Sequence, residues 1–357
     1  MTSSASHLSA WASRHPSIAA LLACLVGGSL CAVLRTPLPW MIGPLAAMAA
    51  LKFCGLDLRA PRGAREAGQV VIGTALGLYF TPTVAREVAS RWELLLAAAA
   101  LATVLSYGGA WIISRFSDTD RITALFASVP GGATEMAVLG ERYGGRVDRI
   151  AVAQSLRILM VVVIVPFGFA ASGVKGADLY LQVDVPPSMA GLGALFACAL
   201  CGGLLFRAVR LPNAWMLGPL AACIVLTASG IAWTSMPTLL TNAGQLLMGC
   251  ALGSRFERES MRRAPRFVAV VAASVVVAMG CSVLVAALLA RISLVPLPTL
   301  VLATAPGGIA EMCITAKVLQ LGVPLVTAAH VTRVVILVTT TVPVFRLVRS
   351  ALRARRS

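Results

Sequence analysis

Apolar stretches alternate with short polar segments along almost the whole chain. Many of the stretches approach or exceed about 18 residues, the length at which a helix can cross ~30 Å of hydrocarbon. Each half of the chain contains six such stretches. They cover residues 17–34, 38–54, 66–81, 92–114, 122–140 and 149–172, and then 188–209, 213–231, 241–256, 266–290, 296–320 and 323–345. The pattern predicts an all-α integral membrane protein.

An internal repeat relates the two sets of stretches at an offset of 175 to 176 residues. Three blocks recur. They are Trp-Met-x-Gly-Pro-Leu at 40–45 and 215–220, Ala-Gly-Gln-x-x-x-Gly-x-Ala-Leu-Gly at 67–77 and 243–253, and Pro-Gly-Gly-x-x-Glu-Met at 130–136 and 306–312. Arg157 and Arg333 also match. Agreement at nearly one offset indicates a duplication. The first stretch therefore has a counterpart at 188–209, which predicts a retained helix rather than a cleaved signal.

The positions of the arginines favour one membrane topology over another. Arginines gather in 55–65, 207–212, 255–266 and the C-terminal tail, and basic loops of membrane proteins face the cytoplasm. If all six stretches of each half crossed, 255–266 and the tail would lie on opposite sides. If the fifth stretch returns to its starting side, all four basic segments share one side. We therefore expect two inverted repeats of about five spanning helices, each with a broken or re-entrant element.

This topology divides the chain into five parts. We expect the protein to lie in a bacterial inner membrane with both termini on the cytoplasmic side. The parts are an N-terminal segment 1–16, membrane repeat 1 at 17–172, an external linker 173–187, membrane repeat 2 at 188–345 and a basic tail 346–357.

Composition and missing motifs exclude several classes of function. Hydrophobic residues make up 58% of the chain and charged residues 12%, against roughly 25% charged in soluble domains. The net charge is +16, but no helix-turn-helix or zinc-finger spacing suggests a nucleic-acid partner. Three histidines without metal-ligand spacing, and no phosphate-binding loop, predict no metal, no cofactor and no enzyme. The expected partners are membrane lipid, a small-molecule substrate and a second copy in a homodimer.

The two Pro-Gly-Gly elements are the strongest candidates for a binding site. Pro130, Gly131 and Gly132 interrupt one apolar stretch, and the second repeat places the same three residue types at Pro306, Gly307 and Gly308. Irregular backbone at membrane depth is tolerated where it is buried in protein or lines a wet cavity. Paired interruptions in two repeats indicate the binding site of a transporter. The alternative is a simple turn between helices.

Charged residues follow each Pro-Gly-Gly element at matching places. Glu135 and Glu311 lie in apolar surroundings, and Arg157 and Arg333 each follow their glutamate by 22 residues. Intramembrane charges are costly and mark ion or substrate pathways, or pair with one another. We predict that the arginines bind an anionic substrate and that the glutamates accept a proton or cation; the alternative is a structural Glu–Arg pair in each half.

Three glutamines and a histidine complete the predicted site. Gln69 and Gln245 occupy matching positions, and both are candidates for a polar path. Gln154, a third candidate for the polar path, matches His330, and a histidine can relay protons near neutral pH. The alternative for each side chain is hydrogen bonding within the helix packing.

The duplicated blocks resemble those of the bacterial AbrB-type membrane protein family, and the resemblance covers nearly the whole chain. Members of that family carry labels as regulators of gene expression or ammonia monooxygenases. The second label implies metal ligands that the sequence lacks. The inverted ten-helix layout is also similar, as a fold-level analogy, to cation/proton antiporter-type transporters.

The sequence therefore predicts a secondary transporter for a small anionic or zwitterionic metabolite, coupled to H⁺ or Na⁺. The second hypothesis is a membrane-embedded regulator of gene expression that acts through a partner. A monooxygenase is the third and is disfavoured.

Overall fold

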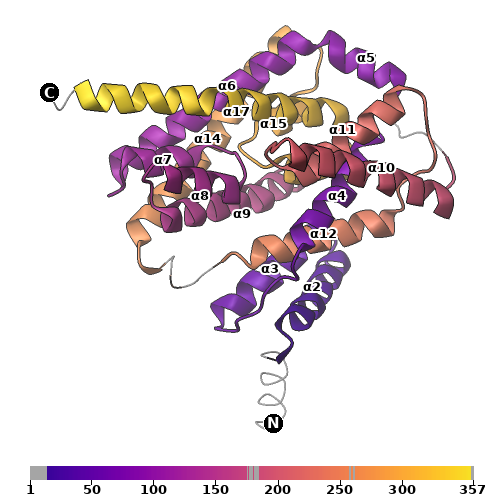
Figure 1. Ribbon diagram of the computed structural model, residues 1–357, viewed down its shortest axis with the longest axis horizontal. Helices are drawn as coiled ribbons and strands as arrows, with labels where there is room; N and C mark the ends of the chain where they lie inside the picture. The colour runs from indigo at the N-terminus through magenta and orange to yellow at the C-terminus, as the bar shows by residue number, and fades with distance from the viewer. Residues whose placement is uncertain are drawn as a thin grey trace. The chain divides into compact units, whose positions relative to one another are not determined.

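The computed structural model describes residues 14–174, 176, 180, 185–256, 259 and 262–354. Within these residues the chain forms fifteen helices and no strand (Figure 1). Six of the helices are long and apolar enough to cross a membrane. They are α2 (Pro16–Val33), α6 (Trp92–Phe116), α9 (Val147–Ala171), α10 (Met189–Ala208), α14 (Pro265–Ile292) and the Val323–Thr340 part of α17 (Val323–Ala354). This confirms the all-α class with membrane-type helices.

Four further helices are shorter than a straight membrane span, and α11 is the apolar one among them. They are α3 (Pro39–Phe53), α4 (Ala64–Gly77), α11 (Ala214–Ala228) and α12 (Thr238–Gly253). Each has 14 to 16 residues and is therefore about 21–24 Å long. Ten complete crossings, as expected from the sequence, stay a prediction. The short helix α5 (Pro82–Ser90) was not predicted, and it buries only Val84 and Val88.

The chain divides into two compact units, and each unit contains segments of both predicted repeats. Unit 1 comprises Met1–Ala89, Val162–Arg263 and Cys313–Pro324, and unit 2 comprises Ser90–Val161, Ala264–Met312 and Leu325–Ser357. The units therefore cut across the predicted repeats, whose boundaries stay a prediction. Residues 1–13, most of the predicted linker and residues 355–357 lie outside the described residues.

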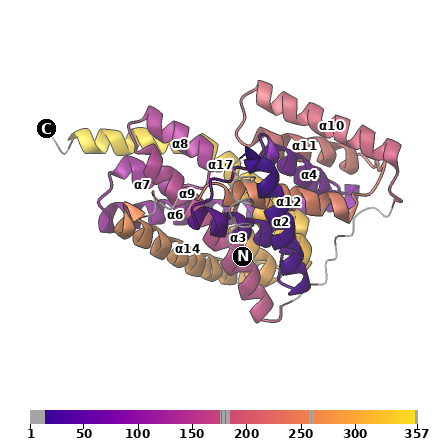
Figure 2. The ribbon, with the colours of Figure 1, turned by 90° about the horizontal axis from the view of Figure 1, so that it is seen from below.

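In unit 1, glycines bring pairs of helices into close contact in the same way in both repeats. Helix α2 packs on α3 and α10 packs on α11 (Figures 1 and 2). A Cβ added to Gly27 would lie 2.6 Å from the carbonyl oxygen of Gly43, and one added to Gly202 would lie 2.5 Å from that of Gly218. Such close backbone approach requires small residues on both helices.

Helices α4 and α12 occupy the interior of unit 1 and pack on each other and on α11 and α3. A Cβ added to Gly73 would lie 2.6 Å from the carbonyl oxygen of Met216, and Gly249 is packed equally tightly against that of Met41. The repeated Ala-Gly-Gln blocks therefore form helix contacts, as their small residues predict.

Each fifth apolar stretch forms two short helices instead of one long one. Residues 122–140 correspond to α7 (Arg121–Ser128) and α8 (Ala133–Arg142), and residues 296–320 to α15 (Leu297–Thr304) and α16 (Ile309–Leu319). Helix α7 packs on α6, and α15 packs on α14. Only the first four residues of α16 belong to unit 2. The broken element predicted in each half is therefore present.

Candidate functional site

The first break lies between α7 and α8 and contains the first Pro-Gly-Gly element. Helix α7 ends at Ser128, α8 begins at Ala133, and Gly132 has a φ of +86°. Pro130 has no N–H to continue the helix, and the positive φ of Gly132 is a conformation that a Cβ disfavours. The last carbonyl groups of α7 therefore lack the partners that a continuing helix would supply.

Two buried side chains of α9 supply those partners. Gln154 donates from Nε2 to the carbonyl oxygens of Phe126 at 2.7 Å and Val129 at 2.9 Å. Arg157 donates from Nη1 to the carbonyl oxygen of Ser128 at 2.9 Å and from Nη2 to Oε1 of Gln154 at 2.7 Å. A cation at a helix C-terminus also interacts favourably with the helix dipole. Gln154 and Arg157 are thus the C-terminal cap of α7.

The second break, between α15 and α16, is capped in the same way, although Gly308 lacks the positive φ of Gly132. Nε2 of His330, on α17, lies 2.9 Å from the carbonyl oxygen of Leu302. Arg333 donates from Nη1 to the carbonyl oxygen of Ala305 at 2.7 Å and from Nη2 to that of Gly307. His330 and Arg333 are almost fully buried, with exposed fractions of 0% and 1%. The matching positions 154/330 and 157/333 therefore perform the same structural task.

The two glutamates lie against the glycines that precede them. A Cβ on Gly132 would collide with Oε2 of Glu135, and a Cβ on Gly308 would collide with Oε2 of Glu311. Both glutamates are in the first turn of the helix after the break, where a carboxylate interacts favourably with the helix dipole. The second glycine of each Pro-Gly-Gly element thus makes room for a carboxylate.

Charged residues of the two predicted repeats come together in unit 2. The guanidinium of Arg157 interacts electrostatically with Arg333 and with Glu311, both from the other repeat. Oε2 of Glu135 is buried and has no hydrogen-bond partner among the described residues, and no ion pair joins Glu135 to Arg157 there. The acidic neighbour of Arg157 is thus Glu311 rather than the glutamate of its own repeat.

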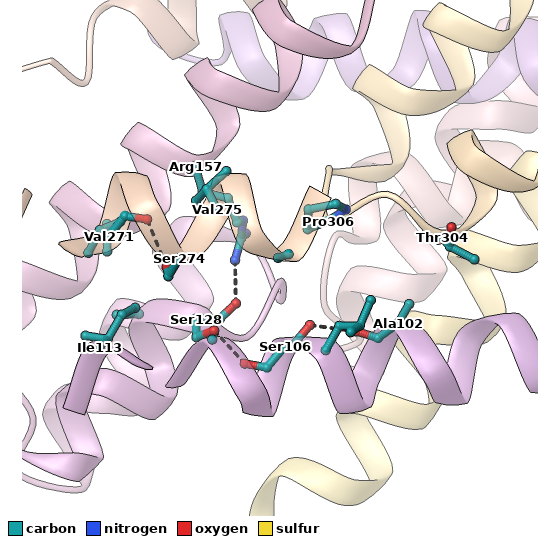
Figure 3. Close-up of a pocket in the computed structure, with 15 residues that line it drawn as sticks. Ala102, Ser106, Ile113, Ser128, Arg157, Val271, Ser274, Val275, Thr304 and Pro306 are labelled. Carbon is teal, nitrogen blue, oxygen red and sulfur yellow. Dashed lines mark hydrogen bonds between the residues drawn. The ribbon is translucent and has the colours of Figure 1, made fainter. Parts of the chain in front are cut away.

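A cavity adjoins this cluster, and all of its walls belong to unit 2. It leaves about 20 Å³ for the centres of water-sized molecules, and about 450 Å³ of empty space when the open solvent at its mouth is counted. Arg157 lines it together with four hydroxyl side chains, Ser106, Ser128, Ser274 and Thr304, and Pro306 lies at its edge. Figure 3 shows Arg157 pointing toward Ser128, and Ser128 toward Ser106. The cavity is therefore lined at once by α6, α9 and α14 and by the ends of both broken helices.

Gln69 and Gln245 are not part of this cluster. They lie on α4 and α12 in unit 1, where their exposed fractions are 7% and 4%. All other residues of the predicted site belong to unit 2.

The four cavity hydroxyls were missed by sequence reasoning. Serine and threonine are common in apolar helices, so residue type alone does not single them out. The repeat holds a signal, because Ser128 and Thr304 each precede a Pro-Gly-Gly element by two residues. Their hydroxyls make equivalent bonds, from Ser128 to the carbonyl oxygen of Ser106 at 2.5 Å and from Thr304 to that of Ser282 at 3.1 Å. Among the described residues, no group of three or more histidine, cysteine, aspartate or glutamate side chains could hold a metal ion.

Comparison with known proteins gives consistent matches. The chain is 26% identical over 283 residues to "Putative regulator AbrB" of Escherichia coli (strain K12), which covers 78% of this chain and 81% of that protein. It is 25% identical over 348 residues to "Uncharacterized protein YhjN" of Bacillus subtilis (strain 168), with 90% of both proteins covered. The family model described as "Transition state regulatory protein AbrB" matches residues 40–349. Because this match spans most of the sequence, the chain belongs to the AbrB family.

Proposed function

We propose that this protein is a secondary transporter that moves a small anionic or zwitterionic metabolite across the bacterial inner membrane, coupled to H⁺ or Na⁺. The observation that carries the proposal is the pair of broken helices in unit 2. Both helices end in carbonyl groups held by a buried arginine, and both reach one cavity. Broken helices in two repeats are how many transporters build a site at membrane depth.

The cost of the arrangement supports a function beyond packing. Two guanidinium groups close enough to repel each other are buried with exposed fractions of 6% and 1%. Burying charges in an apolar medium costs several kcal/mol per ion unless partners compensate. A chain that needed only a turn between two helices could make it with uncharged residues. We assign substrate binding to Arg157, Arg333 and the two Pro-Gly-Gly elements, and ion or proton coupling to Glu135, Glu311 and His330.

The membrane layout that we propose has ten crossings in two inverted repeats, with both termini in the cytoplasm. Its support is the clustering of arginines in four segments that this layout places on one side. The equivalent glycine contacts of the two repeats in unit 1 are in keeping with it. Substrate would reach the cavity alternately from each side, as in transporters of the antiporter type.

The proposal is tested with purified full-length protein in two steps. Thermal stability is first measured against a panel of small metabolites at several pH and Na⁺ values, because a ligand of the folded state raises stability. Uptake of each hit into proteoliposomes is then measured with and without an imposed pH or Na⁺ gradient. Folded Glu311→Gln and Arg333→Ala proteins that retain full gradient-driven uptake would contradict the assigned roles.

A membrane-embedded regulator is the second candidate, and the names of the family and of the Escherichia coli relative favour it. Such a protein would act through a partner at its cytoplasmic surface. Deleting residues 350–357 discriminates between the two. A regulator that docks its partner on the basic tail loses its effect on gene expression, whereas a transporter keeps its flux.

A further inference from the structure

The cavity in unit 2 has a distribution of donors and acceptors that selects among small ligands. Arg157 is the only charged side chain among its fifteen lining residues, all of which are described. The exposed fraction of Arg157 is 6%, and its Nε is buried with no hydrogen-bond partner in the described part of the chain. The guanidinium of arginine can only donate, and it matches a carboxylate in geometry. One carboxylate is therefore accommodated, and a second would find no second lining cation.

The four hydroxyls of the cavity have the opposite character, because each of them already donates its single proton within the protein. Ser106 donates to the carbonyl oxygen of Ala102 at 2.9 Å, Ser274 to that of Val271 at 2.8 Å, and Ser128 and Thr304 to the carbonyl oxygens of Ser106 and Ser282. A hydroxyl whose proton is engaged still offers lone pairs. Toward a ligand, these side chains are therefore acceptors and call for a donor.

The helix ends around the cavity add no free carbonyl acceptors, because Arg157 and Arg333 already cap them. Ser128 is the last residue of α7 and Thr304 the last residue of α15, so the acceptors that these helix ends offer a ligand are the two hydroxyl oxygens. An ammonium group has three donors, whereas a ligand hydroxyl has one. The rest of the wall is formed by small aliphatic side chains. They include Ala102, Leu105, Ile113, Ala153, Val271 and Val275.

We infer that this cavity binds a small aliphatic α-amino acid as its zwitterion. The carboxylate binds Arg157, the ammonium group is received by the hydroxyls of Ser128, Ser274 and Thr304, and the side chain contacts the aliphatic wall. The inference rests on the proposed function, since it names the class of metabolite that the transporter would carry.

The test measures binding of alanine to the purified full-length protein by calorimetry, beside lactate and ethylamine as probes. Lactate replaces the ammonium group by a hydroxyl, and ethylamine lacks the carboxylate. We expect alanine to bind at least tenfold more tightly than either, because each loses a hydrogen bond to a charged group. Lactate binding as tightly as alanine, or no binding of alanine to folded protein, would overturn the inference.

Two serines of α14 supply a matched pair of variants. Ser274 and Ser282 are both buried, with exposed fractions of 5% and 2%, and both donate to a carbonyl oxygen of their own helix. Only Ser274 lines the cavity. Ser274→Ala should weaken alanine binding by about tenfold, and Ser282→Ala should leave it unchanged. Equal effects of the two variants would place the amino acid elsewhere and overturn the inference.

Uptake of labelled alanine and lactate into proteoliposomes separates this inference from the proposed function. Alanine that binds but is not taken up would support the site and contradict transport. Lactate uptake without alanine binding would support an anion transporter and overturn the amino-acid site.

Discussion

The two Pro-Gly-Gly breaks are both capped by an arginine, but they differ in the backbone of the second glycine, whose φ is +86° at Gly132 and not positive at Gly308, and in the side chain that accompanies the arginine. At the first break, Gln154 donates to three carbonyl groups, those of Phe126, Ala127 and Val129, and also accepts a hydrogen bond from Arg157, which bonds directly to one carbonyl. At the second break, His330 bonds to one carbonyl and Arg333 bonds to two. At the first break, Gln154 therefore makes more of the capping hydrogen bonds than Arg157 does.

The difference shows how two elements of similar sequence can take different roles. Arg157 shares its capping task and lines the cavity, whereas Arg333 does not line it and carries most of the cap itself. The first arginine is therefore better placed to exchange a protein contact for a ligand, whereas the second carries more of its helix cap in addition to the substrate-binding role that we propose for it.

The largest expected effect is the loss of Arg333. Arg333→Ala leaves the carbonyl groups of Ala305 and Gly307 without their cap in a buried position and should lower the free energy of unfolding by about 3–5 kcal/mol. Arg157→Ala should cost less, because Gln154 continues to cap α7. Denaturation of the purified protein by SDS measures both, with Arg59→Ala at an exposed site as the control. An equal or greater cost for Arg157→Ala would show that the two arginines are not specialised.

The next largest effect contrasts these breaks with unit 1, where the repeats make equivalent contacts. Gly73→Ala and Gly249→Ala each push a methyl group into a facing backbone carbonyl, and overpacking of this kind costs about 1–3 kcal/mol. We expect the two costs to agree, since the contacts match. Gly108→Ala, whose Cβ would meet nothing within 4 Å, is the control and should not destabilise. The same SDS titration reports all three, and a large disparity between Gly73 and Gly249 would extend the asymmetry to unit 1.

Exchanging the accompanying residues gives a smaller effect with a definite order. Gln154→His removes the acceptor for Arg157 and one carbonyl contact, and should cost about 1–2 kcal/mol. His330→Gln keeps a donor for the carbonyl oxygen of Leu302 and should cost less than about 1 kcal/mol. Thermal unfolding at two pH values measures both variants. The reverse order would mean that the histidine does more than cap α15.

The smallest effect concerns the hydroxyls that tie each broken helix to its neighbour. Ser128→Ala and Thr304→Val each remove one hydrogen bond to a carbonyl group of the adjacent long helix and should cost about 1 kcal/mol. The prediction is checked by thermal unfolding without ligand, with Ser229→Ala, which bonds within its own helix, as the control. If neither variant changed the unfolding temperature, these hydrogen bonds would not contribute to stability.

Much of the fold could be predicted from the sequence because its signals are local. Apolar length located the helices to within a few residues at most ends, and proline with two glycines located both breaks. Helix α5 was missed because Arg86 and Glu87 interrupt its apolar pattern. The division into units could not be read from the repeat, since it depends on which helices pack together rather than on which are similar.

For the site, the sequence supplied the candidates but not their partners. Arg157, Arg333 and Glu311 stood out because charge is rare in apolar helices. Their interaction across the repeats, and the capping of helix ends by Arg157 and Arg333, depend on tertiary contacts between residues 26 to 29 positions apart or more. The serines and the threonine of the cavity could not be distinguished from ordinary helix residues by type.

The interleaving of the repeats in both units has a consequence for biosynthesis. Unit 2 begins at Ser90 but needs the segments that start at Ala264 and Leu325. Ribosomes add about 5–20 residues per second. Roughly ten to thirty seconds would therefore pass between the synthesis of α9 and that of α17. During this delay the buried arginine of the first repeat has no Glu311 beside it. Nascent chains arrested between the two repeats should therefore be sensitive to proteolysis and should depend on membrane chaperones.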